Sequence, residues 1–168
     1  MDFDQAFKEL IGHEGGFQKS PKDRGNWTSG VIGIGQLKGT KFGISAMSYP
    51  KEDIERLTLY RAKEIYKRDF WDRVKAGQLP AQVRFDVFDT AVNSGVTRSI
   101  QFLQRAVREK DDGILGPKTL LAVTTADGDE LRRKFNAQRL LFLADVNSTT
   151  WAEFGRGLVK RVAANLSR

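Results

Sequence analysis

Apolar residues recur along most of this chain at the spacing of one helix face, and this period constrains the fold more than any other feature. The pattern begins with Phe3, Phe7 and Leu10, which follow one another at i, i+4 and i+7. We predict a helix here that Gly15-Gly16 ends, because glycine readily adopts the backbone conformation that closes helices. Further helices are predicted from residue 51 to 71, around 83–92, around 100–107, from Pro117 onward, around 131–146 and over 151–166.

Residues 17 to 50 break this period. The stretch GNWTSGVIGIGQLKGTKFGIS is rich in glycine, serine and threonine, and it is too interrupted for a long helix. It predicts loops with a short hairpin around residues 31–37. The predicted fold class is therefore mainly α, with one irregular region near residues 17–50.

Composition narrows the class of protein. With 168 residues, of which 40% are hydrophobic, the chain is long enough to bury a core as one domain. No run approaches the ~18 apolar residues of a membrane helix, and the opening MDFDQAFKEL lacks the basic start of a secretory signal. Cysteine is absent, which excludes disulfides and thiol chemistry. The net charge of +7 favours polyanionic partners, although a soluble protein that happens to be basic explains it equally well.

Glu14 is the acid whose position is most informative. It follows Leu10 and Ile11 by four and three residues, so a continuing helix places it beside the apolar stripe and at the carbonyl end. Burial and the helix end both raise the pKa of a carboxyl, as a general acid requires. From these residues alone, an ordinary surface glutamate is the more common explanation.

A second carboxyl follows in the next loop. Asp23 comes nine residues after Glu14, and glycoside hydrolysis needs two such acids around one sugar. An ordinary turn aspartate remains open as the alternative. Hydroxyls of the same region, Thr28 and Thr40 among them, could hold a water. His13 is the only histidine and cannot build a metal site alone, so we expect neither a metal nor a cofactor.

Several motifs in order resemble glycoside hydrolase family 108, which includes phage endolysins. The resemblance rests on three groups of residues: His13-Glu14-Gly15-Gly16-Phe17 with Pro21 and Asp23; Gly39-Thr40-Lys41-Phe42-Gly43-Ile44-Ser45; and, further on, Asp69-Phe70-Trp71-Asp72, Asp89-Thr90-Ala91-Val92-Asn93-Ser94-Gly95, Leu103-Gln104-Arg105-Ala106 and the turn from Asp112-Gly113 to Thr119.

The resemblance implies a lysozyme-like helical fold and a muramidase activity on the β-1,4 bond between N-acetylmuramic acid and N-acetylglucosamine. It implies that Glu14 is the catalytic acid, with Asp23 and Thr40 completing the catalytic set. Whether Asp23 acts as nucleophile, base or support stays open, as does retention against inversion. The predicted substrate-binding residues are Phe17, Trp27, Tyr49, Trp71 and Asn93, although core packing is an equal explanation for Trp71.

The same resemblance implies one compact unit, with a catalytic region over residues 1–80 and a peptidoglycan-binding region over 81–168. The expected partner is bacterial peptidoglycan, bound by a monomer that takes no nucleic acid. A phage lysin of this kind is expected in the host cytoplasm and reaches the wall through a separate pore.

Two other functions remain open from the sequence. A lytic transglycosylase would need the acid Glu14 without a second carboxylate, and a basic wall-binding or nucleic-acid-binding protein would need neither. The C-terminal helical segment carries four basic residues against an apolar face: Arg156, Lys160, Arg161 and Arg168. Such a helix could lie on an anionic membrane or lipopolysaccharide, although packing against the core is the more common explanation.

Overall fold

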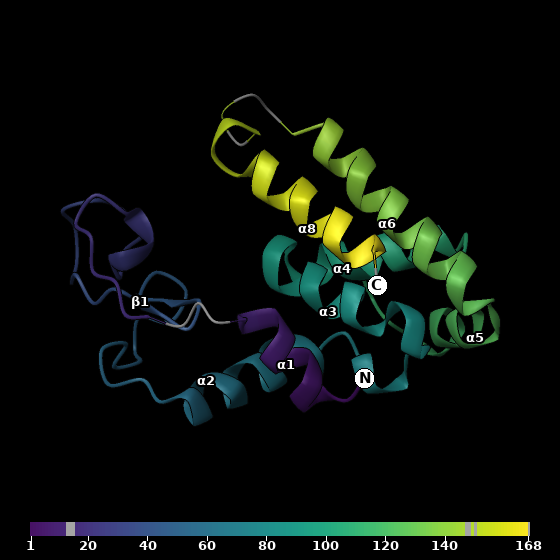
Figure 1. Ribbon diagram of the computed structural model, residues 1–168, viewed down its shortest axis with the longest axis horizontal. Coiled ribbons are helices and arrows are strands. Elements are labelled where there is room, and N and C mark those ends of the chain that lie inside the picture. The colour runs from purple at the N-terminus through teal and green to yellow at the C-terminus, as the bar shows by residue number, and fades with distance from the viewer. Residues whose placement is uncertain (13–15, 147–148, 150, 168) are drawn as a thin grey trace. The chain divides into compact units, whose positions relative to one another are not determined.

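The computed structural model describes residues 1–12, 16–146, 149 and 151–167, and 59% of it is helical. The predicted mainly α fold class is confirmed (Figure 1). The chain divides into two compact units, one of residues 2–68 and one of residue 1 with residues 69–168. We predicted that a catalytic region, 1–80, and a second region, 81–168, pack together as one compact unit. How the two units pack is not tested, so this stays a prediction.

The first unit opens with helix α1, Phe3–Ile11. Asp2 and Gln5 form a reciprocal capping box at its start, because each side chain accepts from the other residue's backbone N–H. The helix ends at Ile11, with Gly12 as C-cap at φ 58°. The prediction that Gly15-Gly16 ends it was wrong, because the helix already ends at Ile11 and Gly12 adopts a positive φ that favours glycine and leaves the helix.

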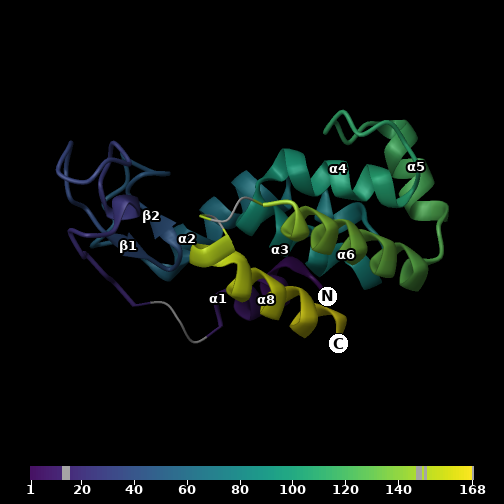
Figure 2. The same ribbon diagram turned by 90° about the horizontal axis from the view of Figure 1, so that it is seen from above.

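An irregular segment follows, as predicted. It contains a short 3-10 turn, η1 (Arg24–Asn26), and a two-stranded antiparallel hairpin of β1 (Thr40–Lys41) and β2 (Ile44–Ser45). The predicted hairpin around residues 31–37 was wrong, because that stretch forms turns and only Leu37 makes a bridge, to Trp27. The tight turn is instead at Phe42-Gly43, where both residues have positive φ. Figure 2 shows β1 and β2 within this loop-rich segment.

Helix α2, Leu59–Tyr66, packs against α1. We predicted that helix from residue 51, but it begins only after Thr58, whose side chain accepts from the backbone N–H of Arg61. The buried ring of Tyr66 meets Phe7 of α1 edge-on at 5.5 Å between centroids. The Tyr66 hydroxyl donates to the Phe42 carbonyl at 3.1 Å. This aromatic contact therefore joins both helices to the hairpin turn.

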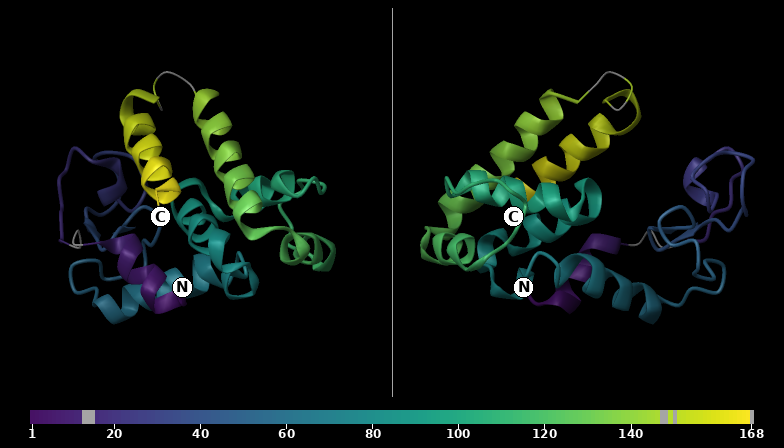
Figure 3. Two further views of the ribbon diagram at one scale, coloured as in Figure 1. Left: turned by 45° about the vertical axis from the view of Figure 1, so that its right-hand side comes forward. Right: turned by 180° about the vertical axis from the view of Figure 1, so that it is seen from behind.

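The second unit is built around helix α3, Ala81–Ser94. It is reached through a π-helical turn, η2 (Lys67–Trp71), and a 3-10 turn, η3 (Ala76–Gln78). The other elements are α4 (Val96–Ala106), α5 (Pro117–Thr125), α6 (Gly128–Ala144), the turn η4 (Trp151–Gly155) and α8 (Arg156–Leu166). Figures 1 and 3 show α6 and α8 side by side, and Figure 2 shows α4 along α6.

Two buried aspartates on α3 fasten the later helices to it. Asp89 is fully buried and accepts from Arg139 of α6 at 2.8 Å and from Arg161 of α8 at 2.6 Å. Asp86, one turn earlier, accepts from Arg132 at 3.1 Å. Burial is the main influence on Asp86 and raises the pKa of that carboxyl against the opposing effect of the arginines. The charge cluster holds α3, α6 and α8 in one arrangement.

Helix α8 thus turns one of its basic side chains, Arg161, inward. Val162 and Asn165 of the same helix are also buried, which gives α8 a face packed on its own unit. Among the described helices, none combines the length and the apolar character needed to cross a bilayer.

Candidate active site

Two side-chain amides form the centre of the irregular segment. Gln18 and the fully buried Asn26 exchange hydrogen bonds, because Nδ2 of Asn26 donates to Oε1 of Gln18 at 2.8 Å and Nε2 of Gln18 donates to Oδ1 of Asn26 at 3.0 Å. The second N–H of Asn26 donates to the Ser20 carbonyl at 2.9 Å. The paired amides fix one another's orientation, since a rotated amide would place oxygen against oxygen.

The predicted residues Asp23 and Thr40 both attach to this amide pair. The remaining N–H of Gln18 donates to Oδ2 of Asp23 at 3.0 Å, and Oγ1 of Thr40 donates to Oδ1 of Asn26 at 2.8 Å. The backbones of Gln18 and Thr40 are also paired, with N to O distances of 2.8 and 2.9 Å. The structure therefore brings two of the predicted catalytic side chains into one hydrogen-bonded network.

The hydrogen bonds within the network determine which donors and acceptors of Thr40 and Asp23 remain free for a further partner. The only proton of the Thr40 hydroxyl is directed to Asn26, so this oxygen can accept but not donate. Asp23 accepts from Gln18 on one oxygen and from the Gly25 N–H on the other, at 2.8 Å, and both oxygens keep a lone pair. A water bound to either residue would therefore donate to it and keep its own lone pairs free.

Gly39 lets the chain approach itself closely enough to form the network. It lies just before Thr40 at φ 91°, a conformation that residues with side chains rarely adopt. A Cβ there would lie 2.5 Å from the Gln18 carbonyl and 2.7 Å from the Phe17 ring. Only glycine fits between these groups.

Three of the predicted substrate-binding aromatics come from this same unit. Phe17 is 38% exposed and covers Gly39. Trp27 is half-buried, and its indole N–H donates to the Pro21 carbonyl at 3.0 Å. Tyr49 is also half-buried, and its backbone N–H donates to the Ser45 carbonyl. Phe17 and Trp27 thus lie in the same segment as the network, with part of each side chain exposed to solvent.

The other two predicted substrate-binding residues lie in the second unit. Trp71 is buried and meets Phe88 edge-on at 5.3 Å between ring centroids. Asn93 is exposed, and its amide donates to the backbone carbonyl of Asp89 at 2.8 Å and to the Asp89 carboxylate at 3.0 Å. In this unit Trp71 contributes to the core and Asn93 to the cluster around Asp89.

Glu14, the predicted acid, and His13 lie outside the described residues. Among the residues that are described, no three histidine, aspartate or glutamate side chains gather as metal ligands.

The sequence did not predict Gln18 and Asn26, the residues that join Asp23 to Thr40. Gln18 and Asn26 are 8 residues apart, and Asn26 and Thr40 are 14 residues apart. The backbone between them is irregular, so no sequence period indicates that they meet. The one available signal was Asn26 itself, since a polar residue next to Gly25 and Trp27 in a short loop is a candidate for local hydrogen bonding.

The mainly α fold agrees with the lysozyme-like helical fold that the motif resemblance implies. The family model described as Glycosyl hydrolase 108 matches residues 7–95, more than half of the chain. The chain therefore belongs to the glycosyl hydrolase 108 family and is a glycoside hydrolase, which confirms the resemblance seen in its motifs.

A second model, described as "Predicted Peptidoglycan domain", matches residues 98–163. The solved structure of Brucella abortus SagA is similar to this chain at 30% identity and a TM-score of 0.80, over 99% of this chain and 92% of that one. Among curated proteins, none matches. Together these similarities make the protein a peptidoglycan hydrolase.

Proposed function

We propose that this hydrolase is a muramidase that cleaves the β-1,4 bond between N-acetylmuramic acid and N-acetylglucosamine, with Glu14 as general acid. The observation that carries the proposal is the network of Gln18 and Asn26, which presents Asp23 and Thr40 together in the segment that follows Glu14. A glycosidase needs a carboxylate or a positioned water opposite its general acid, and this network can supply both.

In the proposed mechanism, Glu14 protonates the glycosidic oxygen, which leaves as the 4-hydroxyl of N-acetylglucosamine. A water held between Asp23 and Thr40 attacks the anomeric carbon of the muramic acid residue, and Asp23 takes the proton that this water releases. Thr40 can only accept from the water, because its own proton is donated to Asn26. The water thus keeps a lone pair for the attack.

This assignment predicts inversion at the anomeric carbon, because water attacks directly from the side opposite the leaving oxygen. Proton NMR of the first product formed should show the α-anomer of the new reducing end. A β-anomer at early times would exclude the direct attack and point to a covalent intermediate or to attack from the same face.

The activity is tested with purified peptidoglycan, wild-type enzyme and the variant Glu14→Gln. We expect reducing muramic acid ends by mass spectrometry from the wild type and at least a thousandfold slower release from Glu14→Gln, on the order of what removing a general acid costs. Glu9→Gln, an exposed glutamate on α1, is the matched control and should keep its activity. Unchanged lysis by Glu14→Gln would contradict the assignment, and 1,6-anhydro ends would identify a lytic transglycosylase instead.

We further propose that the protein works as an endolysin, made in the cytoplasm of the host and released to the wall through a separate membrane pore. Expression in a Gram-negative host should then lyse the cells only when a pore-forming protein is produced with it. Lysis on expression alone would contradict the need for a pore.

A further inference from the structure

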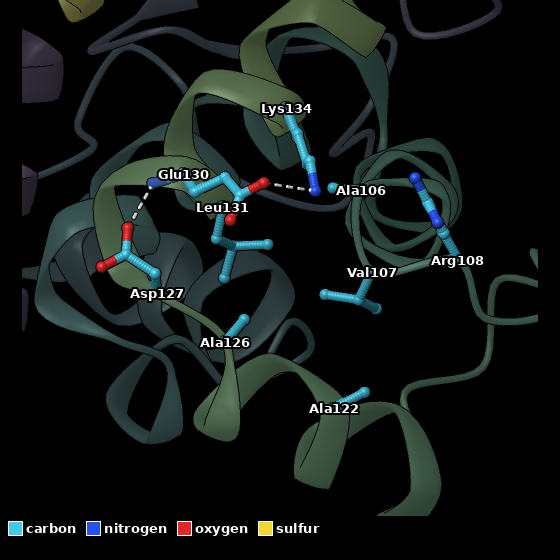
Figure 4. Close-up of a pocket in the computed structure, with 9 residues that line it drawn as sticks. All are labelled: Ala106, Val107, Arg108, Ala122, Ala126, Asp127, Glu130, Leu131 and Lys134. Atoms are coloured by element: carbon cyan, nitrogen blue, oxygen red, sulfur yellow. Dashed lines mark hydrogen bonds and ion pairs between the residues drawn. The ribbon is translucent and has the colours of Figure 1, made fainter.

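The second unit contains a pocket that the proposed reaction does not use. It has a volume of about 310 Å³ and lies among the end of α4, helix α5 and the start of α6 (Figure 4). All of its residues fall within the part of the chain that matches the peptidoglycan domain. Apolar side chains and charged side chains both line it: Ala106, Val107, Ala122, Ala126 and Leu131, with Arg108, Asp127, Glu130 and Lys134.

Arg108 occupies a position where glycine is the usual residue. Helix α4 closes with a Schellman motif, because the N–H of Glu109 donates to the Gln104 carbonyl at 2.9 Å and that of Arg108 to the Arg105 carbonyl at 3.1 Å. In this motif the residue at Arg108 is left-handed, and its φ is 59°. Such a conformation costs a residue with a side chain roughly 1–2 kcal/mol. The chain therefore keeps this arginine at the expense of stability.

The guanidinium of Arg108 is not used to hold the fold. Within the described part of the chain it makes no hydrogen bond or ion pair, and the side chain is exposed. Figure 4 shows Lys134 of α6 at the upper edge of the lining residues and Arg108, from the turn after α4, at their right-hand edge. Lys134 is paired with Glu130 at 2.7 Å, and Asp127 caps α6 by accepting from the Glu130 N–H. A strained cation with no structural partner at the edge of a pocket is a candidate for ligand binding.

The chemistry of the pocket selects a peptide rather than a sugar. Among the described residues that line it, none carries an aromatic ring, whereas sugar faces commonly pack on such rings. Three of its apolar side chains are alanine methyl groups, which leave room for other small side chains. Its charged groups include two cations and two carboxylates, which suit a ligand that carries both a carboxylate and an ammonium group.

We propose that this pocket binds the uncross-linked peptide stem of peptidoglycan, with Arg108 and Lys134 at a stem carboxylate. The stem combines alanine methyl groups, free carboxylates and the free amine of a diamino acid, which are the groups that the pocket complements. The proposal rests on the proposed function only in taking peptidoglycan as the substrate, since the pocket lies in a different unit from Asp23 and Thr40.

The test uses the full chain and the synthetic stem tetrapeptide L-Ala-γ-D-Glu-meso-diaminopimelate-D-Ala, with calorimetry for affinity and amide NMR shifts for location. We expect the shifts to centre on α4, α5 and α6. Arg108→Gly should weaken the affinity about tenfold, as loss of a charge-assisted hydrogen bond does. It should also raise the Tm by about 2 °C, because glycine is relaxed at this φ. Arg108→Lys should keep part of the affinity.

Two matched controls separate the pocket from general charge. Arg133→Ala removes an exposed cation next to Lys134 that does not line the pocket, and Lys110→Ala removes one near Arg108. Both should bind the tetrapeptide as the wild type does, and a tetrapeptide with amidated carboxylates should bind more weakly. An equal loss in Arg133→Ala or Lys110→Ala would overturn the proposal.

Failure of the pocket proposal and failure of the muramidase assignment give different results in these experiments. Tetrapeptide binding that depends on Arg108 supports the pocket even if Glu14→Gln retains full lysis. Normal cleavage without tetrapeptide binding overturns the pocket and leaves the muramidase standing. Binding of peptide-free glycan strands at α4, α5 and α6, in place of the tetrapeptide, also overturns it.

Discussion

Replacement of Asn26 by alanine is the sharpest test of how the candidate active site is held. Asn26 is fully buried, and its amide takes part in four hydrogen bonds, two with Gln18 and one each with Ser20 and Thr40. Each neutral hydrogen bond contributes about 0.5–1.5 kcal/mol, and partners left buried without one cost more. Water can reach Gln18 and Ser20, which are exposed. We therefore expect Asn26→Ala to lower the free energy of unfolding by about 3 kcal/mol and the Tm by about 6–12 °C.

The catalytic effect follows from the released Thr40 hydroxyl. Without Asn26 as acceptor, this hydroxyl rotates and can donate its proton to the water, and Gln18 no longer has a fixed orientation toward Asp23. Loss of such positioning lowers rates on the order of tenfold to a hundredfold. The loss should appear in kcat more than in KM, since no residue expected to bind the sugars is changed.

The assay is release of reducing ends from purified peptidoglycan, run well below the Tm of the variant, beside thermal unfolding followed by circular dichroism. Ser29→Ala is the control, because Ser29 hydrogen-bonds within the same loop to Ile34 but not to the network. A lowered Tm with an unchanged kcat would refute the positioning role of the amide pair. An unchanged Tm would show that the hydrogen bonds of Asn26 do not contribute the expected free energy of unfolding.

Other substitutions test the close approach, the buried charges and the pH response. Gly39→Ala should unfold at a Tm several degrees lower, because its Cβ would lie 2.5 Å from the Gln18 carbonyl at a φ of 91°. Asp89→Asn should lower the free energy of unfolding in urea by about 3 kcal/mol or more, because it leaves buried arginine charge without its carboxylate. The hydrogen bond from Arg61 lowers the pKa of Glu52 below 4.5 in the folded protein. On acidification, Glu52 is therefore protonated at a higher pH in the unfolded chain than in the folded one. The stabilisation is present above pH 4.5 and is lost as the pH falls through the folded pKa, and thermal unfolding of Glu52→Gln should show a shallower acid decline than the wild type.

Each of these variants has a matched control. Gly157→Ala adds a methyl group within α8 with nothing within 4 Å of it, and it should not lower the Tm. Asp129→Asn changes an exposed aspartate in the first turn of α6, and Glu55→Gln changes an exposed glutamate near Glu52. A control that loses as much stability as its partner would contradict the explanation offered for that pair.

The parts of the fold that could be predicted are those with a periodic signal. The stripe from Phe3 to Ile11, the one within α3 and the Pro117 start of α5 all correspond to helices, because a buried helix face repeats at a fixed spacing. Element ends were less predictable. Thr58 delays the start of α2, and Gly12 ends α1 early, because a single capping residue outweighs a continuing apolar pattern.

The candidate site divides in the same way. Asp23 and Thr40 could be selected from their residue types and motifs, but nothing periodic links them to Gln18 and Asn26. The pairing of Asp89 with Arg139 was equally hidden, since 50 residues separate them. Contacts of this kind depend on the tertiary structure, and a sequence pattern carries no direct trace of them.

The buried Asp89 has a consequence for exchanging parts between related hydrolases of this family. The glycosyl hydrolase match ends at residue 95, which makes the start of α4 an inviting place to join one protein to another. A crossover there would take Asp89 from one parent and Arg139 and Arg161 from the other. If the second parent lacked a matching arginine, the buried carboxylate of Asp89 would have no ion-pair partner. A crossover between residues 68 and 69 keeps donor and acceptors from one parent. Recombination among such enzymes should therefore tolerate breakpoints before α3 far better than breakpoints after it.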